Sequence, residues 1–390
     1  MAGAMVTARR AAEIAPFEVM DVLARAHALE RAGRHVVHME IGEPDFTAPE
    51  PVVEAGVRAL REGRTAYTAT LGLTALREAI AQHYASRFGA DLPPERVVIT
   101  AGASGGLLTV AALYVDALDE VLVPDPGYPG YRHFVRAFEG RARPLAVTAA
   151  HNFQPTAAMV REAWTARTKA LILGTPSNPT GTLISRSELE AIARFIAERG
   201  GVLIVDEIYQ GLSYGAEPWT ALGLPGEVVV INSFSKYFCM TGWRLGWAVL
   251  PAQAVRGFEK LAQHLFISAP SVAQHAACAA FGPESLAILE ARRREFARRR
   301  DVLLPALKAA GLAVPAEPRG AFYIYADCAR DAREYCLQLL EREAVAATPG
   351  VDFGANGTSH HVRFAYTRAM ADIEEAARRI RRFAVSLPSA

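Results

Sequence analysis

The sequence predicts an α/β protein: a three-layer sandwich with a mostly parallel central sheet, joined to a smaller α/β domain. Two observations lead to this prediction. Short apolar runs of strand length alternate with amphipathic helical patterns through the middle of the chain. The 390 residues, 51% hydrophobic and 21% charged, exceed an average domain and can bury a large core.

The predicted strands of the central sheet are continuous apolar runs, as expected for strands that are buried on both faces. Their residues are 97–100, 121–124, 170–173, 202–206, 228–232 and 247–250. Between two of these strands, residues 187–199 form an amphipathic pattern in which Leu189, Ile192 and Ile196 share one helical face. Ser185 and Glu188 have the spacing of a capping box, which predicts the start of this helix.

The C-terminal third predicts the smaller domain. Residues 284–310 form one long helix whose arginine run, 292–300, we interpret as a solvated face. Two strands, 321–326 and 361–366, follow with a helix near 330–342 between them. We expect the N-terminal segment to complete this part. The predicted domains are therefore residues 46–285, and residues 1–45 together with 286–390.

Composition excludes several classes of protein. A net charge of +1 argues against a nucleic-acid binder, which needs many phosphate contacts. The four cysteines have no zinc or redox spacing, so the sequence indicates no metal site and a reducing compartment. The uncharged runs 97–115 and 261–283 contain glycine, glutamine and proline, which favours buried structure over a membrane span. We therefore expect a soluble cytoplasmic protein.

The segment 233–247 is the richest in candidate chemistry, and it follows a predicted strand. Ser233, Ser235, Lys236 and Arg244 place two hydroxyl groups, an amine and a guanidinium within twelve residues. The planar fork of arginine suits phosphate, whereas a partly buried lysine loses its charge easily and becomes nucleophilic. Because open α/β sheets bind ligands at the carboxyl ends of their strands, we expect an anion site beside a reactive amine.

Three further segments follow predicted strands. The glycine-rich turn 101–106, with Ala103 and Ser104, brings backbone N–H groups to a helix N-terminus where anions bind, although such turns also serve tight packing. Asp206 follows a buried strand, where a carboxylate needs a cation or strong donors unless it caps a helix. Asn178 lies in a turn and is a candidate ligand only after that structural role.

In their order along the chain, these segments resemble the class I and II aminotransferases, the large fold-type-I family of pyridoxal-phosphate enzymes. The resemblance covers nearly the whole length, and the ordered set of motifs is far more specific than any one of them. The motifs are Ile41-Gly42-Glu43-Pro44-Asp45-Phe46, Tyr67-Thr68, the turn 101–106, Pro126-Gly127-Tyr128-Pro129, residues 178–181, Asp206-Glu207-Ile208-Tyr209, Ser233-Phe234-Ser235-Lys236, Arg244 and Arg363.

The resemblance implies how the cofactor, pyridoxal 5′-phosphate, is held. Lys236 forms the Schiff base with its aldehyde, and Asp206 pairs with the pyridine nitrogen. Tyr209 and Asn178 bond the phenolic oxygen of the ring, and Tyr128 stacks on the ring. The phosphate of the cofactor is held by hydroxyl, guanidinium and backbone groups. These belong to Ser233, Ser235, Arg244, Ala103 and Ser104.

The resemblance also implies the substrate site and the assembly. Arg363 grips the α-carboxylate of the substrate in bidentate fashion, with Gly42 and Asn178 nearby. Tyr67 reaches the phosphate in the neighbouring subunit, which implies a homodimer. The reaction implied is transamination between an L-amino acid and a 2-oxo acid by a ping-pong mechanism. Because no further cation adjoins a motif, the sequence favours neutral or aromatic amino donors.

Two alternatives stay open at this point. Another pyridoxal-phosphate reaction on the same scaffold, such as that of a C–S β-lyase, shares almost every residue named above. A transcriptional regulator with an aminotransferase-like domain needs a separate DNA-binding module, and the residues before Gly42 do not have the pattern of a winged helix.

Overall fold

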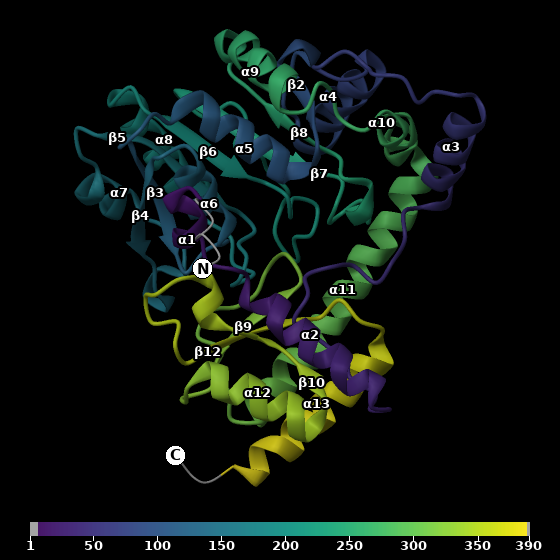
Figure 1. The fold of residues 1–390 in the computed structure, drawn as a ribbon, viewed down its shortest axis with the longest axis vertical. Coiled ribbons are helices and arrows are strands. Elements are labelled where there is room, and N and C mark those ends of the chain that lie inside the picture. The colour runs from purple at the N-terminus through teal and green to yellow at the C-terminus, as the bar shows by residue number, and fades with distance from the viewer. Residues whose placement is uncertain (1–6, 388–390) are drawn as a thin grey trace, which may run out of the picture.

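A seven-stranded sheet organises the larger part of the protein (Figure 1), in a computed structural model that describes residues 7–387. The strand order is β2-β8-β7-β6-β5-β3-β4, and β8 alone runs antiparallel to its neighbours. The predictions for residues 1–6 and 388–390 lie outside the described residues. The strands are β2 (Val97–Thr100), β3 (Glu120–Asp125), β4 (Arg141–Ala146), β5 (Thr168–Gly174), β6 (Val202–Asp206), β7 (Glu227–Ser233) and β8 (Gly246–Val249).

Both faces of this sheet are covered, which confirms the three-layer sandwich. In β6, Val202 and Ile204 join one apolar cluster, while Leu203 and Val205 join the other. The first cluster contains side chains of α5 (Gly102–Tyr114), α6 (Gly130–Ala137) and α9 (Ala252–Leu265). The second contains those of α4 (Thr74–Phe88), α7 (Ala157–Ala163) and α8 (Arg186–Glu198). Such double burial explains why these strands are continuously apolar.

The edge strand β4 was not among the predicted strands. Its sequence, Arg-Ala-Arg-Pro-Leu-Ala, is interrupted by two arginines and by Pro144. Proline lacks a backbone donor, and sheets tolerate it at an edge. β4 pairs only with β3, so one side of the strand needs no hydrogen-bonding partner in the sheet.

A smaller group of elements lies below this sheet in Figure 1. It contains the antiparallel sheet β11 (Thr348–Pro349), β12 (His361–Ala365) and β9 (Tyr323–Asp327). The parallel pair of β1 (Val37–His38) and β10 (Val345–Ala346) ties the N-terminal segment to the C-terminal third. The helices here are α2 (Glu18–Arg31), α12 (Ala332–Glu343) and α13 (Met370–Ser386). By contrast, α1 (Arg9–Glu13) pairs with α6 through Glu13 and Arg136.

The long helix is α11 (Pro283–Ala309), and the solvated-face interpretation of its arginine run is wrong in part. Arg299 is buried, and its guanidinium pairs with Asp45 at 2.8 Å and lies over the ring of Phe46. Arg293 donates to Glu290 and to the carbonyl oxygen of Ser213. Helix periodicity turns only some of these arginines to solvent, because the same helix packs on both parts of the protein (Figure 1).

The remaining predictions about local structure concern caps, spans and cysteines. Ser185 Oγ accepts the N–H of Glu188, while the Glu188 carboxylate bonds Ala157 N instead of closing the capping box. No helix within residues 7–387 is long and apolar enough to cross a membrane. All four cysteines are free thiols. Two further helices, α3 (Glu50–Arg61) and α10 (Ser271–Ala277), pack against each other.

Candidate active site

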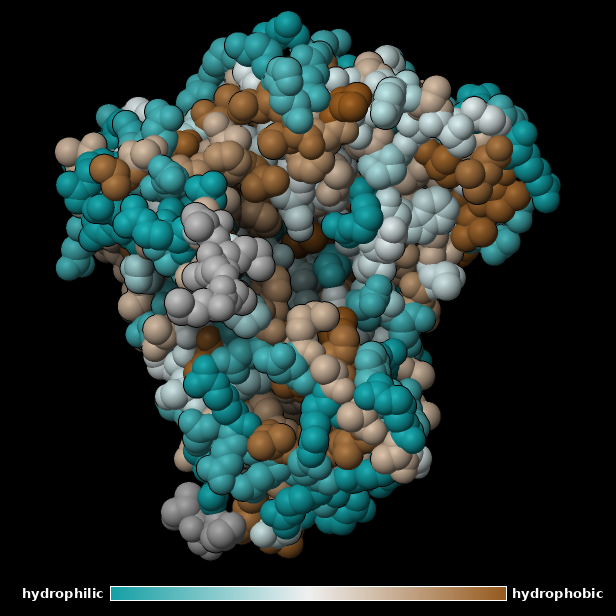
Figure 2. Space-filling view, viewed as in Figure 1, coloured by the Kyte–Doolittle hydropathy of each residue, from teal (hydrophilic) through white to brown (hydrophobic). Residues whose placement is uncertain are grey.

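A cavity of about 300 Å³ lies at the carboxyl edge of the seven-stranded sheet. Strands β2, β3, β5, β6 and β7 are mutually parallel, so the segments that follow them meet at this edge. The smaller part of the protein closes the other side, and the molecular surface is hollowed where the two parts meet (Figure 2). The cavity thereby collects Ser104, Tyr128, Asn178, Asp206, Tyr209, Ser235, Lys236, Arg244, Arg363 and Gly42, all predicted as site residues.

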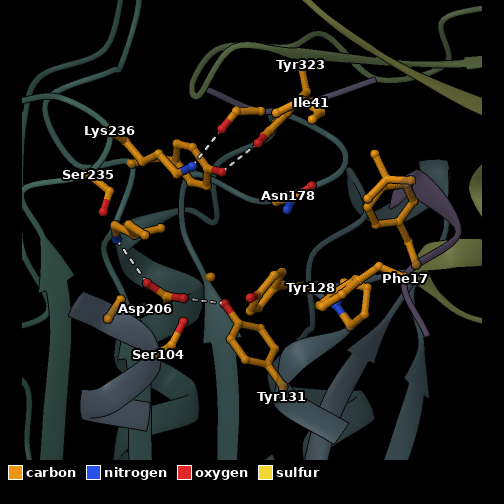
Figure 3. Close-up of a pocket in the computed structure, with 18 of the residues that line it drawn as sticks. Phe17, Ile41, Ser104, Tyr128, Tyr131, Asn178, Asp206, Ser235, Lys236 and Tyr323 are labelled. Atoms are coloured by element: carbon orange, nitrogen blue, oxygen red, sulfur yellow. Dashed lines mark hydrogen bonds between the residues drawn. The ribbon is translucent and has the colours of Figure 1, made fainter. Parts of the chain in front are cut away.

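Lys236 is the amine of this cavity. Its Nζ donates to the carbonyl oxygen of Gly42 at 2.6 Å, across the boundary between the two parts of the protein (Figure 3). Burial lowers the pKa of Lys236 to about 8, opposed by the negative charge of Glu43 and assisted by the positive charges of Arg363 and Arg244. A large share of this amine is therefore neutral near pH 8, the form that attacks carbonyl groups.

Asp206 lies at the end of β6 and is 3% exposed. Its Oδ2 accepts the hydroxyl of Tyr131 at 2.9 Å, and its Oδ1 accepts the N–H of Ile208 at 3.0 Å (Figure 3). Burial raises the pKa of Asp206 to about 6, and these two donors limit the rise. The carboxylate is therefore held by strong donors and faces the cavity rather than capping an α-helix.

One end of the cavity is built to receive an anion. The first turn of α5 brings Ala103 and Ser104 there, opposite Ser235 and Arg244. Gly102 makes this approach possible: its φ is +72°, and a Cβ on it would lie 2.6 Å from Arg244 Nη2. The guanidinium therefore lies directly against the start of the helix, where backbone N–H groups and a positive charge together favour phosphate.

Two predicted cofactor residues do not line the cavity. Ser233 is buried, with its Oγ 3.0 Å from the carbonyl oxygen of Leu245 and 2.9 Å from Ser235 Oγ. Ser233 therefore supports Ser235 from behind. Tyr67 is 78% exposed, and its loop is anchored by the bond from Ser271 Oγ to the carbonyl oxygen of Ala66.

Arg363 lies in β12, buried under the opposite end of the cavity. Its Nη1 donates to Asn178 Oδ1 at 2.9 Å, and its Nη2 donates to the carbonyl oxygen of Glu40. The guanidinium lies over the rings of Tyr323 and Phe353, 4.4 and 4.7 Å from their centroids. Its Nε has no hydrogen-bonding partner within the described chain. An arginine that is buried between aromatic rings and incompletely bonded can receive a carboxylate.

Tyrosines form much of the cavity wall. Tyr209 and Tyr323 share a hydrogen bond of 2.7 Å between their hydroxyl oxygens. Tyr323 also explains why residue 42 is a glycine, because a Cβ at this position would lie only 1.7 Å from the Tyr323 hydroxyl oxygen. Tyr128 meets the ring of Tyr131 edge to face, with centroids 5.3 Å apart.

The sequence did not reveal four of the lining residues. Tyr131 had a weak signal, because it lies three residues after Tyr128 where a helix begins. Tyr323, Phe17 and Asp352 carry no local motif. They come from a β-strand, the N-terminal segment and a short 3-10 turn, and only the tertiary fold brings them together.

Comparisons with known proteins agree with this geometry. Residues 34–380 match the family described as aminotransferase class I and II. The chain is 40% identical to the (5-formylfuran-3-yl)methyl phosphate transaminase of Methanocaldococcus jannaschii, over 94% of this chain and 96% of that protein. It is 38% identical to the valine–pyruvate aminotransferase of Mycobacterium tuberculosis, over 95% and 96% of the two chains.

Solved structures show the same fold. The aspartate aminotransferase of Thermus thermophilus with maleate superposes with a TM-score of 0.92 at 34% identity, covering 97% of this chain and all of that chain. An aminotransferase from Mycobacterium tuberculosis superposes with a TM-score of 0.94 at 38% identity, over 98% of this chain and all of the other. The match of sequence, fold and cavity shows that this chain belongs to the class I and II aminotransferase family.

Proposed function

We propose that the protein is a pyridoxal-phosphate-dependent aminotransferase. It transfers the amino group of a neutral or aromatic L-amino acid to a 2-oxo acid by a ping-pong mechanism, and it works as a homodimer. One observation carries the proposal. The amine of Lys236, whose pKa is lowered, lines the same cavity as the buried carboxylate of Asp206 and the guanidinium of Arg363.

The residues present suit the cofactor. The narrow space between Gly102 and Arg244, together with the hydroxyls of Ser104 and Ser235 and the N–H of Ala103, would hold the phosphate. Ser233 would position Ser235.

Asp206 would hold a proton on the ring nitrogen, because a buried carboxylate is stabilised by a cation at that atom. Tyr209 and the amide N–H₂ of Asn178 would donate to the phenolic oxygen of the ring, and Tyr128 would lie against the ring. When bound, pyridoxal phosphate supplies an electron sink that stabilises negative charge at the substrate Cα.

The remaining chemistry belongs to the side chains. Lys236 would bind the cofactor covalently and, once displaced by substrate, would act as the base that takes the proton from Cα. A pKa of about 8 suits this role, because a neutral amine must accept the proton near physiological pH. Arg363, held by Asn178 and Glu40, would bind the α-carboxylate and fix the orientation of the Cα–H bond.

The wall around the substrate side chain supports the preference for neutral donors. Phe17, Ile41 and Phe353 give this wall an apolar surface. Asp352 is buried in the same wall, with Oδ1 accepting the N–H of Glu18 at 2.9 Å. The cations among the described lining residues are Lys236, Arg244 and Arg363, and each already has a role. Arg132 donates to the Asp352 carbonyl oxygen but is not among the described residues that line the cavity. A distal carboxylate on the substrate would therefore meet a like charge, with no further cation among the described lining residues to compensate it.

A panel of amino donors tests the proposal. With 2-oxoglutarate as acceptor, we expect kcat/KM for phenylalanine, tyrosine or valine to exceed kcat/KM for aspartate. Asp352→Asn removes the opposing charge and is expected to raise kcat/KM for aspartate about tenfold, equivalent to roughly 1.4 kcal/mol. Asp301→Asn, at an exposed position on α11, is the matched control and leaves the ratio unchanged.

The reaction products distinguish a failure of the aminotransferase assignment from a failure of the substrate preference. In the absence of acceptor, an aminotransferase converts its bound cofactor stoichiometrically to the pyridoxamine form. Release of ammonia and pyruvate from a sulfur amino acid would instead identify the C–S β-lyase activity and overturn the transferase proposal. Faster turnover of aspartate than of phenylalanine would overturn the substrate preference alone.

A further inference from the structure

Three potential metal ligands meet on the smaller part of the protein, away from the residues that line the cavity. His27 and Glu30 are three residues apart on α2, and His38 ends β1. One ligand atom from each lies within 4.8 Å of the others. His38 Nε2 is 3.0 Å from Glu30 Oε1, and the rings of His27 and His38 have centroids 5.8 Å apart. This density of imidazole and carboxylate atoms matches the donors that zinc-like ions use.

A buried carboxylate lies behind His38. Glu40 Oε1 is 2.7 Å from His38 Nδ1, so the histidine is fixed with Nε2 directed at Glu30. The Glu40 side chain is fully buried, and its Oε2 has no hydrogen-bonding partner within the described residues. Metal-binding histidines commonly donate their second ring nitrogen to such a carboxylate, which fixes the tautomer and strengthens the ligand.

We propose that His27, Glu30 and His38 bind a first-row divalent transition-metal ion such as Zn²⁺, with Glu40 as the residue that positions His38. In the metal-free protein, the His38 ring lies between the two carboxylates, with Nδ1 at Glu40 and Nε2 at Glu30. The metal ion would bind at Nε2, where His27 and Glu30 also offer ligand atoms, and His38 would donate to Glu40 through Nδ1. Glu40 would then lie behind the His38 ring without touching the ion.

Arg368 is a further charge that acts on this site. Arg368 donates its Nε to the carbonyl oxygen of His38 at 3.3 Å, and its positive charge opposes that of a bound ion. Arg368 is directed at the backbone and leaves both ring nitrogens of His38 to the carboxylates. The carboxylates of Glu30 and Glu40 therefore supply the negative charge that stabilises a bound metal ion.

A second cluster, Asp327 with His360 and His361, also has its ligand atoms within 4.8 Å of one another, but no buried carboxylate lies behind its histidines among the bonds of the described residues. His361 Nδ1 is 2.8 Å from the carbonyl oxygen of Gly357, and His360 Nδ1 is 3.2 Å from the same His361 nitrogen. Its ligand atoms are thus turned towards each other and towards a backbone carbonyl. The contrast favours the α2–β1 cluster and makes the second cluster a useful control.

The position of the site suggests its effect. A metal ion there joins α2 to β1, and the start of α2 carries Val19 and Met20 in the cavity wall. The Glu40 carbonyl oxygen accepts from both Arg363 and Thr348. The ion would therefore stabilise the segment that closes one side of the cavity.

The test uses untagged protein with its cofactor bound, freed of metal by a chelator and titrated with Zn²⁺ against a chromophoric competitor. We expect one equivalent to bind, the melting temperature to rise, and His27→Ala to abolish both effects. His27 is exposed, so its loss leaves the fold intact. Glu40→Gln is expected to weaken binding about 10- to 100-fold. His360→Ala is the control and keeps wild-type affinity.

Co²⁺ gives a second readout that does not depend on catalysis, because its visible spectrum reports the nitrogen and oxygen ligands around it. Affinity is expected to fall as pH decreases, because protons compete with the metal ion for the imidazole and carboxylate ligand atoms. Absence of stoichiometric binding, or equal affinity in wild type and His27→Ala, would overturn the proposal. Either result would leave His38 with a purely structural role between Glu30 and Glu40.

Discussion

Lys236 and Asp206 show how burial prepares single residues for chemistry. Both are taken from water in the same cavity, and in both cases desolvation disfavours the charged form. The effect lowers the pKa of the amine and raises that of the carboxylate. Asp206 nevertheless stays mainly ionised at pH 7, because its pKa rises only to about 6. Lys236, with a pKa of about 8, is about half neutral at pH 8.

The pH dependence of cofactor capture follows from the state of Lys236. Starting from cofactor-free protein, we expect the rate of covalent attachment to rise with pH and to level off above about 8, the pKa of the buried amine. An ordinary lysine, with a pKa of 10.5, would show a rate that continues to rise past pH 9. Stopped-flow absorbance of the attached cofactor measures this rate.

Variants at two lysines distinguish the residue responsible. Lys236→Ala is expected to show no attachment at any pH, by absorbance and by mass after borohydride reduction. Lys260→Ala, at an exposed position on α9, should behave as wild type. Attachment that survives in Lys236→Ala would show that another amine binds the cofactor.

At this scale, motif residues were predictable and their partners were not. Lys236 and Asp206 follow predicted strands and attracted attention by their residue type, whereas Arg363 was named only through the family resemblance. Tyr131 donates to Asp206, and Tyr323 bonds Tyr209, yet each is an isolated tyrosine in an apolar context. The first pair is separated by 75 positions in the sequence and the second pair by 114. Such contacts depend on the order of the strands in the sheets, and a local sequence pattern does not contain that order.

Elements followed the predictions where burial is uniform. The six strands predicted for the central sheet are all present, because a strand buried on both faces must be apolar throughout. β4 escaped prediction because an edge strand can carry arginine and proline. In α11, charge pattern alone could not show that Arg299 would face Asp45 and two aromatic rings.

The N-terminus of α8 permits a prediction about one element. Ser185 Oγ accepts the N–H of Glu188 and satisfies one of the donors that an α-helix leaves free at its start. Ser185→Ala is expected to lower the free energy of unfolding by about 1 kcal/mol. Urea denaturation of the cofactor-free protein measures the change.

Two matched variants test the cause. Ser185→Asp keeps a side-chain acceptor and is expected to retain wild-type stability. Ser187→Ala removes an exposed hydroxyl that lies 3.2 Å from Ser185 Oγ but leaves the bond from Glu188 N to Ser185 Oγ in place, and it should change stability by less than about 0.5 kcal/mol. Equal losses in Ser185→Ala and Ser187→Ala would contradict a capping role.

On the scale of the whole molecule, we propose that residues 46–285 form a cofactor-binding domain and that residues 1–45 with 286–390 form a second one. The pairing of β1 with β10 supports the joining of the two chain ends. The active site then lies at the domain boundary, where Lys236 reaches Gly42 and Asn178 reaches Arg363. The ion pair between Glu13 and Arg136 crosses the same boundary.

The proposed dimer accounts for Tyr67, whose ring is 78% exposed although its loop is anchored. We propose that its hydroxyl donates to the cofactor phosphate in the neighbouring subunit. Tyr67→Phe is then expected to weaken cofactor binding about 10- to 100-fold, as for loss of a hydrogen bond to a charged group. Tyr114→Phe, which removes a hydroxyl without a partner in the described structure, is the control for equilibrium dialysis.

Mixed dimers decide which subunit Tyr67 serves. A dimer of one Tyr67→Phe chain and one Lys236→Ala chain has one intact site if the tyrosine acts across the interface, because both defects then fall in the other site. It has no intact site if each tyrosine serves its own chain. At a cofactor concentration between the two dissociation constants, we therefore expect about half of wild-type activity. Activity no higher than that of the Tyr67→Phe homodimer would contradict the exchange, because both sites of the mixed dimer would then be defective.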